Sequence, residues 1–564
     1  MKKLLLTAVN ARFTHSNLAI RYLRNRVSDL PYEIEIVEFS LKNPLKSILE
    51  RIWIKQPEIL AISVYIWNVD IIRQFLLEIK KIVPSLTIIL GGPEVSFDPE
   101  SWIEDFPQID FIVCGAGESG FRYLLENDLD VTETIIRKTN PLFNQIRFPY
   151  SDVDFPDLKD KYIYYESSRG CAYNCIYCLS SRLDQKLDFR DLSKVKRELL
   201  YLIEQNVRII KFVDRTFNIK FSFSRAIWNY LIDLEPQTKF HFEIHPDLLK
   251  DKDFEILMKA PAGLFQFEVG VQSVNSRTIS EIERIDNWQD SKIKIKKLIE
   301  MGNIHIHLDI LAGLPLENIT DYSRSFDQVH KLNPHHLQVG FLKILKGTEL
   351  SKRCSKYEMI SMSSAPYQVL KNRWLDFADL LKIQQIEKII DIYYNPGTFK
   401  TIQENLIPLF TSPFELYADF AIFLNEQEFN YETKNWQING KLLMKFCIQK
   451  FADKTDFFVD CLRWDWCKIS ESHFYPLFIR NIEDKKIKKI NYEILNRSMQ
   501  DGKFDLEKWQ LKSAIFFTAK TEDFKKKYLP DDSFAAFIKK GENRKGRNRE
   551  KDIIKLNSKN SVSL

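Results

Sequence analysis

The sequence predicts an α/β protein with a doubly wound parallel sheet first, a partial barrel of six βα units next and a mainly helical domain last. Three observations support this fold class. Short apolar runs alternate with longer amphipathic runs over the first two thirds of the chain, three cysteines cluster in one loop, and the last third is rich in aromatic, helical stretches. A chain of 564 residues is too long for one hydrophobic core, so we expect roughly two to four domains.

The first domain is expected over residues 1–135. Runs of strand-forming residues alternate there with stretches of helical spacing, which predicts parallel strands joined by crossover helices. The expected strands are 3–9, 34–37, 59–64, 86–90 and 111–114, and the expected helices are 18–27, 45–54, 71–83 and 121–126. The opening apolar run, Leu4–Val9, is too short for a signal peptide and is interpreted as the first strand.

Two of these strands end in glycine-rich turns, one of which also holds an acidic residue. The positions are Gly91, Gly92, Gly115, Gly117 and Glu118. Ligands of doubly wound sheets bind outside the carboxyl ends of the strands, and glycine lets the backbone approach a ligand closely. We therefore expect a ligand site at this edge. Residues 136–160 are expected to form a linker, because prolines and repeated acidic residues interrupt any periodic pattern there.

The three clustered cysteines, Cys171, Cys175 and Cys178, have the spacing C-x3-C-x2-C within the stretch ESSRGCAYNCIYCLSS. Three thiolates at this spacing can bind three irons of a cubane [4Fe–4S] cluster and leave the fourth iron open to a small molecule. Zinc sites usually need two C-x2-C pairs or additional histidines, and no histidine lies near this loop. Ordinary core thiols are the alternative, but three of eight cysteines in one short loop argue against it.

Residues 161–350 are expected to form the barrel, with the cysteine loop after its first strand. The expected strands are 162–166, 208–213, 240–244, 264–271, 305–311 and 336–341. Reactive groups of barrels lie at the carboxyl ends of strands. The residues at or just after these ends include Asp214, Glu243, Gln272, Ser273 and Gly313. His305 and His307 share one face of a strand, but no third ligand stands at metal spacing, so we interpret them as strand residues.

A mainly helical domain of unknown function is expected over residues 351–538. Helical stretches are predicted at 368–394, 414–424 and 441–452. Cys461 and Cys467 could belong to an auxiliary cluster, but too few further cysteines are available, so we interpret them as core thiols. Residues 539–564 begin with the basic run KKGENRKGRNREK and are expected to form a disordered tail.

Composition narrows the classes of partner. The net charge of +5 is small for this length and argues against a dedicated nucleic-acid surface. No stretch approaches the roughly 18 apolar residues of a membrane span, so no membrane partner is expected. Eight cysteines with a single cluster fit a reducing compartment. These observations predict a cytoplasmic protein.

The cysteine loop, with the aromatic Tyr177 directly before its last cysteine, resembles the signature of the radical S-adenosylmethionine (SAM) superfamily. The resemblance implies that Cys171, Cys175 and Cys178 bind a [4Fe–4S] cluster and that its open iron binds SAM. It also implies that SAM is cleaved reductively to methionine and a 5′-deoxyadenosyl radical.

The same resemblance implies SAM contacts after the loop. The backbone of Tyr177 is expected near the adenine, and Asp214 near the amino group. Glu243 is expected near the ribose or methionyl part. The ribose is expected near Gln272 and Ser273, and the adenine near Gly313. The closing segment LKGTEL, residues 345–350, also resembles this family.

The first domain, followed by such a loop, resembles the cobalamin-binding (B12-binding) domain of class B radical SAM proteins. The turns GGPEVS and GAGE carry this likeness and imply cobalamin contacts at Gly91, Gly92, Gly115, Gly117 and Glu118. The motif D-x-H-x-x-G, whose histidine binds cobalt in some of these domains, is absent. His15 stands instead in NARFTHS, and we do not expect it to bind cobalt. The alternative is a domain that has the fold and binds no corrin.

The full arrangement, including the opening NARFTHSNLAIRYL, resembles B12-binding radical SAM proteins with a DUF4080 domain. It implies an enzyme that uses SAM, with cobalamin, to methylate or rearrange an unactivated carbon of an unknown substrate. An electron donor such as flavodoxin or ferredoxin is implied as its partner. Two alternatives stay open. A tRNA methylthiotransferase needs three more cysteines in a first domain that has only Cys114, and a non-catalytic iron–sulfur or corrinoid sensor needs no SAM contacts.

Overall fold

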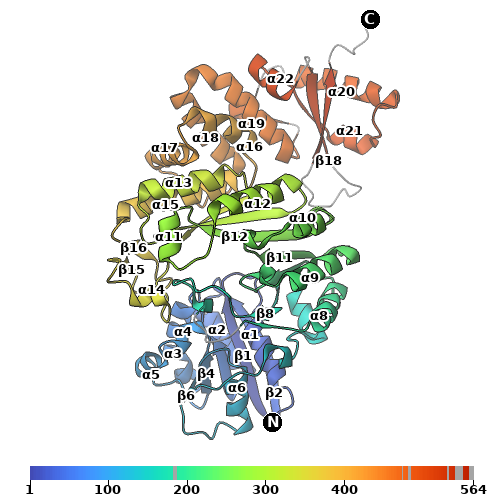
Figure 1. Cartoon of the computed structure of the whole chain (residues 1–564). Coiled ribbons are helices and arrows are strands. Elements are labelled where there is room, and N and C mark those ends of the chain that lie inside the picture. The colour runs from blue at the N-terminus through green and yellow to red at the C-terminus, as the bar shows by residue number, and fades with distance from the viewer. Residues whose placement is uncertain (182–186, 473, 481–483, 530–532, 540–550, 558–564) are drawn as a thin grey trace, which may run out of the picture. The chain divides into compact units, whose positions relative to one another are not determined.

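The computed structural model describes residues 1–181, 187–472, 474–480, 484–529, 533–539 and 551–557 (Figure 1). The chain forms two compact units, residues 1–334 with 338–380 and residues 335–337 with 381–564. The first unit holds two six-stranded sheets, and the second is mainly helical. The predicted fold class is therefore confirmed.

The first sheet has the strand order β2-β1-β3-β4-β5-β6, and all of its pairs are parallel. Its strands are β1 Lys2–Asn10, β2 Tyr32–Ser40, β3 Ile59–Ser63, β4 Thr87–Gly91, β5 Phe111–Val113 and β6 Ile135–Ile136. Its helices are α1 Leu18–Arg26, α2 Leu45–Lys55, α3 Val69–Ile82, α4 Pro93–Ser96, α5 Pro99–Asp105 and α6 Glu118–Glu126. The chain order of strands and helices requires the crossovers that the alternating pattern predicted.

Helices cover both faces of the first sheet (Figure 1). On one face, Ile72 and Phe75 of α3 pack with Leu60 and Ile88. On the other face, α1 and α6 pack against residues such as Ile89. Because both faces are buried, the strands are nearly continuous apolar runs, as is usual for parallel sheets.

The second sheet has the order β14-β13-β12-β11-β10-β7. Its strands are β7 Ile163–Tyr165, β10 Ile209–Phe212, β11 Lys239–Glu243, β12 Phe265–Gln272, β13 His305–Ala312 and β14 His336–Phe341. Its helices are α8 Leu192–Glu204, α9 Phe221–Leu234, α10 Asp251–Leu257, α11 Ser276–Glu281, α12 Trp288–Met301 and α13 Ile319–His330. Shorter elements are α7 Phe155–Leu158, α14 Glu349–Lys352, the pair β8 Ser168–Arg169 with β9 Asp188–Phe189, and the pair β15 Ile360–Ser361 with β16 Val369–Lys371.

The two faces of the second sheet differ in chemistry. Phe242 and Phe267 point to one side, where they pack with Trp228 of α9. Their neighbours in sequence are polar and point to the other side, so burial alternates along β12 and β13. We call this second side, which faces away from the helices, the inner face.

The second unit is built mainly from helices. They are α15 Phe377–Ile389, α16 Lys400–Leu406, α17 Pro413–Glu426, α18 Trp436–Lys450, α19 Thr455–Ile469, α20 Asp484–Gln500, α21 Lys508–Ser513 and α22 Glu522–Tyr528. Its antiparallel sheet has the order β17-β18-β19, with β17 Ile515–Phe517, β18 Ser533–Lys539 and β19 Lys551–Asn557. The boundary between the two units falls within α15, because residues up to Leu380 belong to the first unit and residues from Leu381 belong to the second.

The expected disordered tail is wrong in part. Residues 551–557 form β19 and pair with β18 along its whole length. The sequence Lys551–Asn557, KDIIKLN, alternates apolar and polar residues, which suits a strand with one buried face. The rest of the tail, residues 540–550 and 558–564, lies outside the described residues.

Among the described residues, no single helix is long and apolar enough to cross a membrane. The stretches Lys400–Leu409 and Pro413–Glu426 reach that length only together, and they are bent by 104°.

Candidate functional site

The cysteine loop follows β7, and a buried aspartate fixes its start. Asp214, just after β10, accepts hydrogen bonds from the backbone N–H of Ser167 (3.0 Å) and from the hydroxyls of Ser167 and Ser168 (both 2.6 Å). Burial raises the pKa of Asp214, and these hydrogen bonds oppose the rise. The carboxylate that was expected near the SAM amino group thus positions the segment that leads into the loop.

Backbone hydrogen bonds also anchor the loop between its last two cysteines. The N–H of Ile176 donates to the carbonyl of Ile282 (3.1 Å), and its carbonyl accepts from the N–H of Leu350 (2.8 Å). Cys175 is buried and the other two loop cysteines are half-buried. No disulfide joins any described cysteine. Segments distant in the sequence therefore hold the three thiols on one short loop.

The thiols of this loop fit an iron–sulfur cluster better than a single metal ion. The described residues include no group of three His, Cys, Asp or Glu side chains arranged to hold one ion. A cubane cluster bonds each thiolate to a different iron, so its ligands need not converge on one point. Burial raises the pKa of Cys175, and the neighbouring Arg284 opposes that rise. A cation beside a thiol favours the thiolate, which is the form that binds iron.

An ion-paired arginine precedes the loop. Nη2 of Arg169 lies 2.7 Å from Oε1 of Glu118, and its Nε lies 3.0 Å from Oε2 of Glu166. Burial raises the pKa of Glu166 to about 7, and Arg169 opposes that rise. Glu118 was expected to contact cobalamin, but its carboxylate binds Arg169 and does not line the cavity described next. It joins α6 to the cysteine loop.

A cavity of about 660 Å³ lies beside the cysteine loop. One side of it is the carboxyl edge of the first sheet. The other side is lined by Tyr177 and Cys178 of the loop, by Arg215 after β10, and by Leu345 and Lys346 of the closing segment. Its wall is mainly apolar. Burial raises the pKa of Tyr177, so its hydroxyl stays neutral in this wall.

The four glycines predicted at this edge, Gly91, Gly92, Gly115 and Gly117, all line the cavity. At Gly92, φ is +110° and an added Cβ would lie 2.4 Å from the carbonyl oxygen of Val64, so glycine is required. At Gly115, φ is +83°, but an added Cβ would meet nothing within 4 Å. The edge therefore offers bare backbone beside open space, which suits a large flat ligand such as a corrin.

The cavity continues from this edge along one face of the first sheet. Its deeper wall is formed by small or apolar side chains of the sheet and α1, namely Leu6, Ala19, Ile20, Ala61, Ile89 and Val113. His15 lies elsewhere, with its Nδ1 2.7 Å from the hydroxyl of Tyr164 on β7. Burial and the charge of Lys211 lower the pKa of His15. His15 therefore contacts the barrel, and the deep part of the cavity is apolar.

An arginine connects the cavity with the inner face of the barrel. Nη1 of Arg215, which lines the cavity, lies 3.7 Å from Oε1 of Glu243 at the end of β11. Burial raises the pKa of Glu243 to about 7, and Arg215 opposes that rise. Glu243 is thus a half-buried carboxylate that exchanges its proton near neutral pH.

Ser273 is committed to a contact within the protein. Its hydroxyl donates to Oε1 of Glu317 (2.5 Å), which also accepts from Ser325 (3.0 Å). Burial raises the pKa of Glu317 to about 7. The expected contact of Ser273 with the SAM ribose would require this hydrogen bond to be shared or broken.

Gln272 and Gly313 occupy strained or tight backbone positions at strand ends. Gln272 has φ +66°, where the register between β12 and β13 shifts. Gly313 has φ +95°, and its carbonyl accepts a hydrogen bond from Asn372 Nδ2 (2.9 Å). Strained backbone tends to occur at functional sites. Both remain predicted SAM contacts.

Sequence reasoning missed several polar residues of this region. Arg215 comes shortly after strand β10 and Arg284 shortly after helix α11, but nothing in the sequence indicates which partner each one meets. Lys211 and Glu268 do carry a signal, because polar residues alternate with apolar ones along β10 to β13. That pattern indicates a polar inner face.

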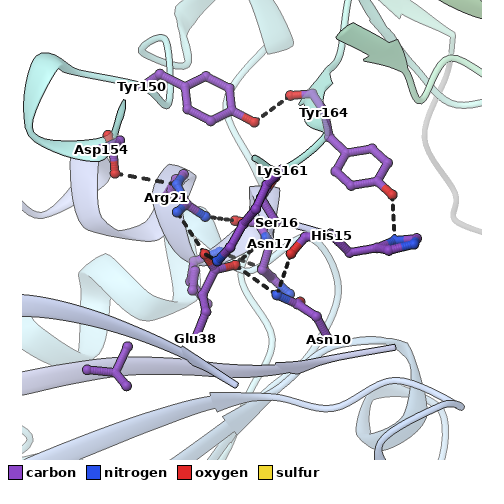
Figure 2. Close-up of polar contacts among 12 residues, drawn as sticks. Asn10, His15, Ser16, Asn17, Arg21, Glu38, Tyr150, Asp154, Lys161 and Tyr164 are labelled. Carbon is purple, nitrogen blue, oxygen red and sulfur yellow. Dashed lines mark hydrogen bonds and ion pairs between the residues drawn. The ribbon is translucent and has the colours of Figure 1, made fainter. Parts of the chain in front are cut away.

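A buried ion-pair network connects the first sheet to the start of the barrel (Figure 2). Arg21 of α1 lies 2.9 Å from Glu38 and 3.4 Å from Asp154, and Lys161 lies 3.3 Å from Glu38. The side chains of Arg21, Glu38 and Asp154 are at most 5% exposed. Burial alone would raise the pKa of Glu38, but Arg21 holds it below the usual value. Residues 136–160, expected as a linker, thus include a buried partner of α1.

Main-chain contacts reinforce this network. The N–H of Tyr162 donates to the carbonyl of Thr14 (2.7 Å), and the hydroxyl of Ser16 donates to the carbonyl of Tyr162 (2.7 Å). His15 and Tyr162 form a parallel bridge. The segment after β1 therefore lies against the start of β7, and Figure 2 shows His15 and Tyr164 pointing toward each other.

Family models match three parts of the chain. They are the B12 binding domain over residues 4–125, the radical SAM superfamily over residues 165–329 and the protein of unknown function DUF4080 over residues 355–545. The first match covers β1 to β5 of the first sheet, and the second covers β10 to β13 of the second sheet.

Individual proteins resemble the chain over these regions. The cobalamin-dependent radical SAM methyltransferase TokK of Streptomyces tokunonensis is 22% identical over 57% of this chain and 52% of its own length. The 2-(S-pantetheinyl)-carbapenam-3-carboxylate methyltransferase of Streptantibioticus cattleyicolor is 25% identical over 47% of this chain and 44% of its own. The chain thus spans about half the length of these curated relatives.

A solved structure extends the likeness in fold. The cobalamin-dependent SAM radical enzyme OxsB, with aqua-cobalamin and SAM bound, superposes with a TM-score of 0.57. The match covers 91% of this chain and 82% of that one, at 14% identity. At this identity the likeness is one of fold.

Proposed function

Because the chain is a radical SAM protein with an N-terminal B12-binding domain and a C-terminal DUF4080 domain, we propose that it is an enzyme that cleaves SAM reductively at a [4Fe–4S] cluster. We propose further that it uses cobalamin to methylate or rearrange an unactivated carbon of a small molecule. The observation that carries this proposal is one shared cavity. Cys178 of the cysteine loop and the glycine-rich edge of the first sheet line the same cavity.

In this proposal different residues of the chain bind the cluster, favour its thiolate ligands and hold a proton. Cys171, Cys175 and Cys178 hold the cluster, which supplies the electron for SAM cleavage when bound. Arg284 favours the thiolate form of Cys175. Glu243, whose carboxyl titrates near neutral pH, is placed to hold or release a proton beside Arg215.

The first domain supplies a binding site governed by shape. Gly92 and Gly115 present backbone to the cavity, and the slot along Ala61 and Ile89 is apolar. Such a slot can take the aromatic base of cobalamin without a histidine, because burial of apolar surface contributes about 25 cal/mol per Å². This supports cobalamin binding and leaves His15 to its contact with Tyr164.

The central test is SAM cleavage by the anaerobically purified, cluster-reconstituted protein after reduction. We expect 5′-deoxyadenosine or S-adenosylhomocysteine to form, and the yield to rise with an anaerobic cell extract as substrate source. An intact reduced cluster that yields neither product would favour the sensor over the enzyme. Flavodoxin or ferredoxin, the proposed electron donor, should replace the chemical reductant in the same assay.

Cobalamin binding is tested by titrating hydroxocobalamin into the full-length protein and recording visible spectra. Gly115→Leu should weaken binding at least about tenfold, because the new side chain enters the cavity. Gly302→Leu is the matched control. Gly302 also has positive φ (+71°) and open space around its Cβ position, but it follows α12, away from the cavity. Equal affinity of both variants would mean that this edge does not hold cobalamin.

The tRNA methylthiotransferase alternative is not favoured. The first domain matches a B12-binding domain and contains one cysteine, Cys114, so it cannot supply three thiolates for a second cluster. We propose a cytoplasmic location, since a reduced iron–sulfur loop needs a reducing compartment. We expect neither nucleic acid nor membrane among the partners.

A further inference from the structure

The inner face of the barrel carries a belt of ionisable side chains. Each of five neighbouring strands contributes one side chain, namely Tyr164, Lys211, His241, Glu268 and His307. The segment after β1 adds His15 at the end of the belt. The interiors of closed barrels are usually filled with branched apolar residues. A belt of this kind is costly to bury and so indicates a binding function.

Most members of the belt have a partner within the protein. His15 contacts Tyr164, and Nε2 of His241 lies 3.0 Å from Glu268. His307 lies 2.9 Å from Asp309 and 4.0 Å from Glu268. Glu243, the other carboxylate of this face, has Arg215 at 3.7 Å. Every carboxylate of the inner face near the belt is therefore matched by a basic side chain.

Lys211 is the exception. No described carboxylate lies within 4.0 Å of its Nζ, which stands over the ring of Tyr162 at 4.9 Å from the ring centroid. Its nearest charges are Glu268 and Glu243, which are both committed to other partners. Burial lowers the pKa of Lys211, and these two carboxylates oppose the shift. A half-buried ammonium without an ion pair is stabilised by an anion that binds from outside the chain.

The belt is accessible from the interior of the barrel. The side chains of Glu268 and His307 keep 28% and 17% of their surface exposed although they stand in the middle of a sheet. Arg215, at the mouth beside the cavity, is 52% exposed and held by one loose ion pair. Arg215 and Lys211 both interact with Glu243, so they belong to the same charged region of the barrel.

We propose that Lys211 binds an anionic oxygen group, a carboxylate or a phosphate, of a small-molecule substrate held on the inner face of the barrel. This inference rests on the proposed function, because it names the substrate class of that enzyme. The neighbouring imidazoles of His241 and His307 set the orientation of the bound group. Lys211 is a specificity-determining residue and takes no part in SAM cleavage.

The experiment uses the cluster-reconstituted, full-length protein in saturating SAM, so that the carboxylate of SAM already has its partners. Equilibrium dialysis measures binding of labelled succinate, glycerol 3-phosphate and, as the neutral analogue, succinamide. We expect at least one anion to bind and succinamide not to bind. Whichever of succinate and glycerol 3-phosphate binds more tightly shows whether the site prefers a carboxylate or a phosphate.

Three variants make the test specific. Lys211→Met should weaken anion binding at least about tenfold, and Lys211→Arg should keep it within about threefold. Lys239→Met is the matched control, because Lys239 is an exposed lysine at the start of β11 in the same sheet. It should bind like the wild type. If Lys211→Met does not fold, the wild type is treated with acetic anhydride with and without the anion. A bound anion should then slow the acetylation of Lys211.

Several results would overturn the inference. They are equal binding by wild type and Lys211→Met, equal binding of succinamide, or no anion binding at concentrations of about 10 mM. The dialysis is repeated without SAM, and an anion that binds only when SAM is left out would assign Lys211 to SAM instead. Iron content and SAM binding are measured in the same preparation. Their loss would refute the proposed function, whereas loss of anion binding alone refutes only this inference.

Discussion

The two sheets of the first unit present ligand-facing surfaces of opposite character. The edge of the first sheet has bare glycine backbone, such as Gly92 and Gly115, above an apolar slot. The inner face of the second sheet has Lys211, His241 and Glu268 on successive strands. In our proposals the first surface selects a ligand by shape and apolar burial, whereas the second selects a ligand by charge. One parallel-sheet architecture can therefore hold a large, constant cofactor on one sheet and a polar, specific substrate on the other.

The largest expected effect falls on the second sheet. Replacing Cys171, Cys175 and Cys178 together with alanine should abolish the iron–sulfur cluster, because the variant lacks the three thiolates that would each bond to one iron. Iron analysis and visible absorbance measure the loss. Cys354→Ala is the control, since Cys354 is a half-buried cysteine outside the loop. A triple variant with full iron content would show that the cluster does not bind at this loop.

The connection between the two sheets should be the next most sensitive feature. Arg21→Leu leaves Glu38 and Asp154 buried with less compensation, so we expect a loss of about 3–5 kcal/mol in the free energy of unfolding. Chemical denaturation measures it. Lys2→Leu removes an exposed ion pair with Asp128 and should cost less than about 1 kcal/mol. Equal costs would mean that the network adds no stability.

Two glycines of the same edge should differ in what they tolerate. Gly92→Ala should cost about 2–4 kcal/mol, because positive φ and a clash with the Val64 carbonyl combine. Gly115→Ala should cost about 1–2 kcal/mol, because only its positive φ opposes a side chain. Thermal unfolding of both variants compares them. A Gly115→Ala variant as unstable as Gly92→Ala would contradict the open space at that position.

The last prediction is a pH dependence of stability through Glu317, a buried carboxyl that follows β13 of the second sheet. Burial raises the folded-state pKa of Glu317 to about 7, above its ordinary value. Its contribution to stability is therefore full below the ordinary pKa and is lost as pH rises toward 7. The wild type should lose up to roughly 3 kcal/mol between pH 4.5 and pH 7.5 through this group.

Glu317→Gln keeps a side-chain oxygen for Ser273 and Ser325 but removes the titrating group. The wild-type minus variant difference in unfolding free energy should thus fall across this pH range. Melting curves at several pH values measure it. A difference that does not change with pH would show that Glu317 titrates normally.

Much of the fold could be predicted because the strands carry clear periodic patterns. The six barrel strands lie within one residue of the expected ranges, and the glycines at the first edge line the cavity as expected. What the sequence does not carry is the direction of a side chain at a strand end. Glu118 stands at the predicted edge but turns to Arg169, and the hydroxyl of Ser273 is used by Glu317.

Ion pairs between segments that are distant in the sequence could not be predicted either. Arg215 meets Glu243, and Arg21 meets Asp154, only after the chain has folded. The strand β19 was missed because its basic flank dominated the composition of the tail. The inner-face belt could have been predicted, since every second residue of β11 and β12 is polar or glycine. In the sequence we applied this alternation only to His305 and His307.

The pairing of the segment after β1 with the start of β7 has a consequence for how this architecture can be exchanged between proteins. The hydrogen bonds of Tyr162 with Thr14 and Ser16 mean that the first domain does not end where its sheet ends. A chimaera joined near residue 135 would separate Arg21 from Asp154 and leave the edge of β7 bare. The segment that has to be exchanged as one piece therefore runs from residue 1 to the end of β7. Any transplant of the cofactor domain onto another barrel has to carry that strand, or rebuild its edge in the recipient.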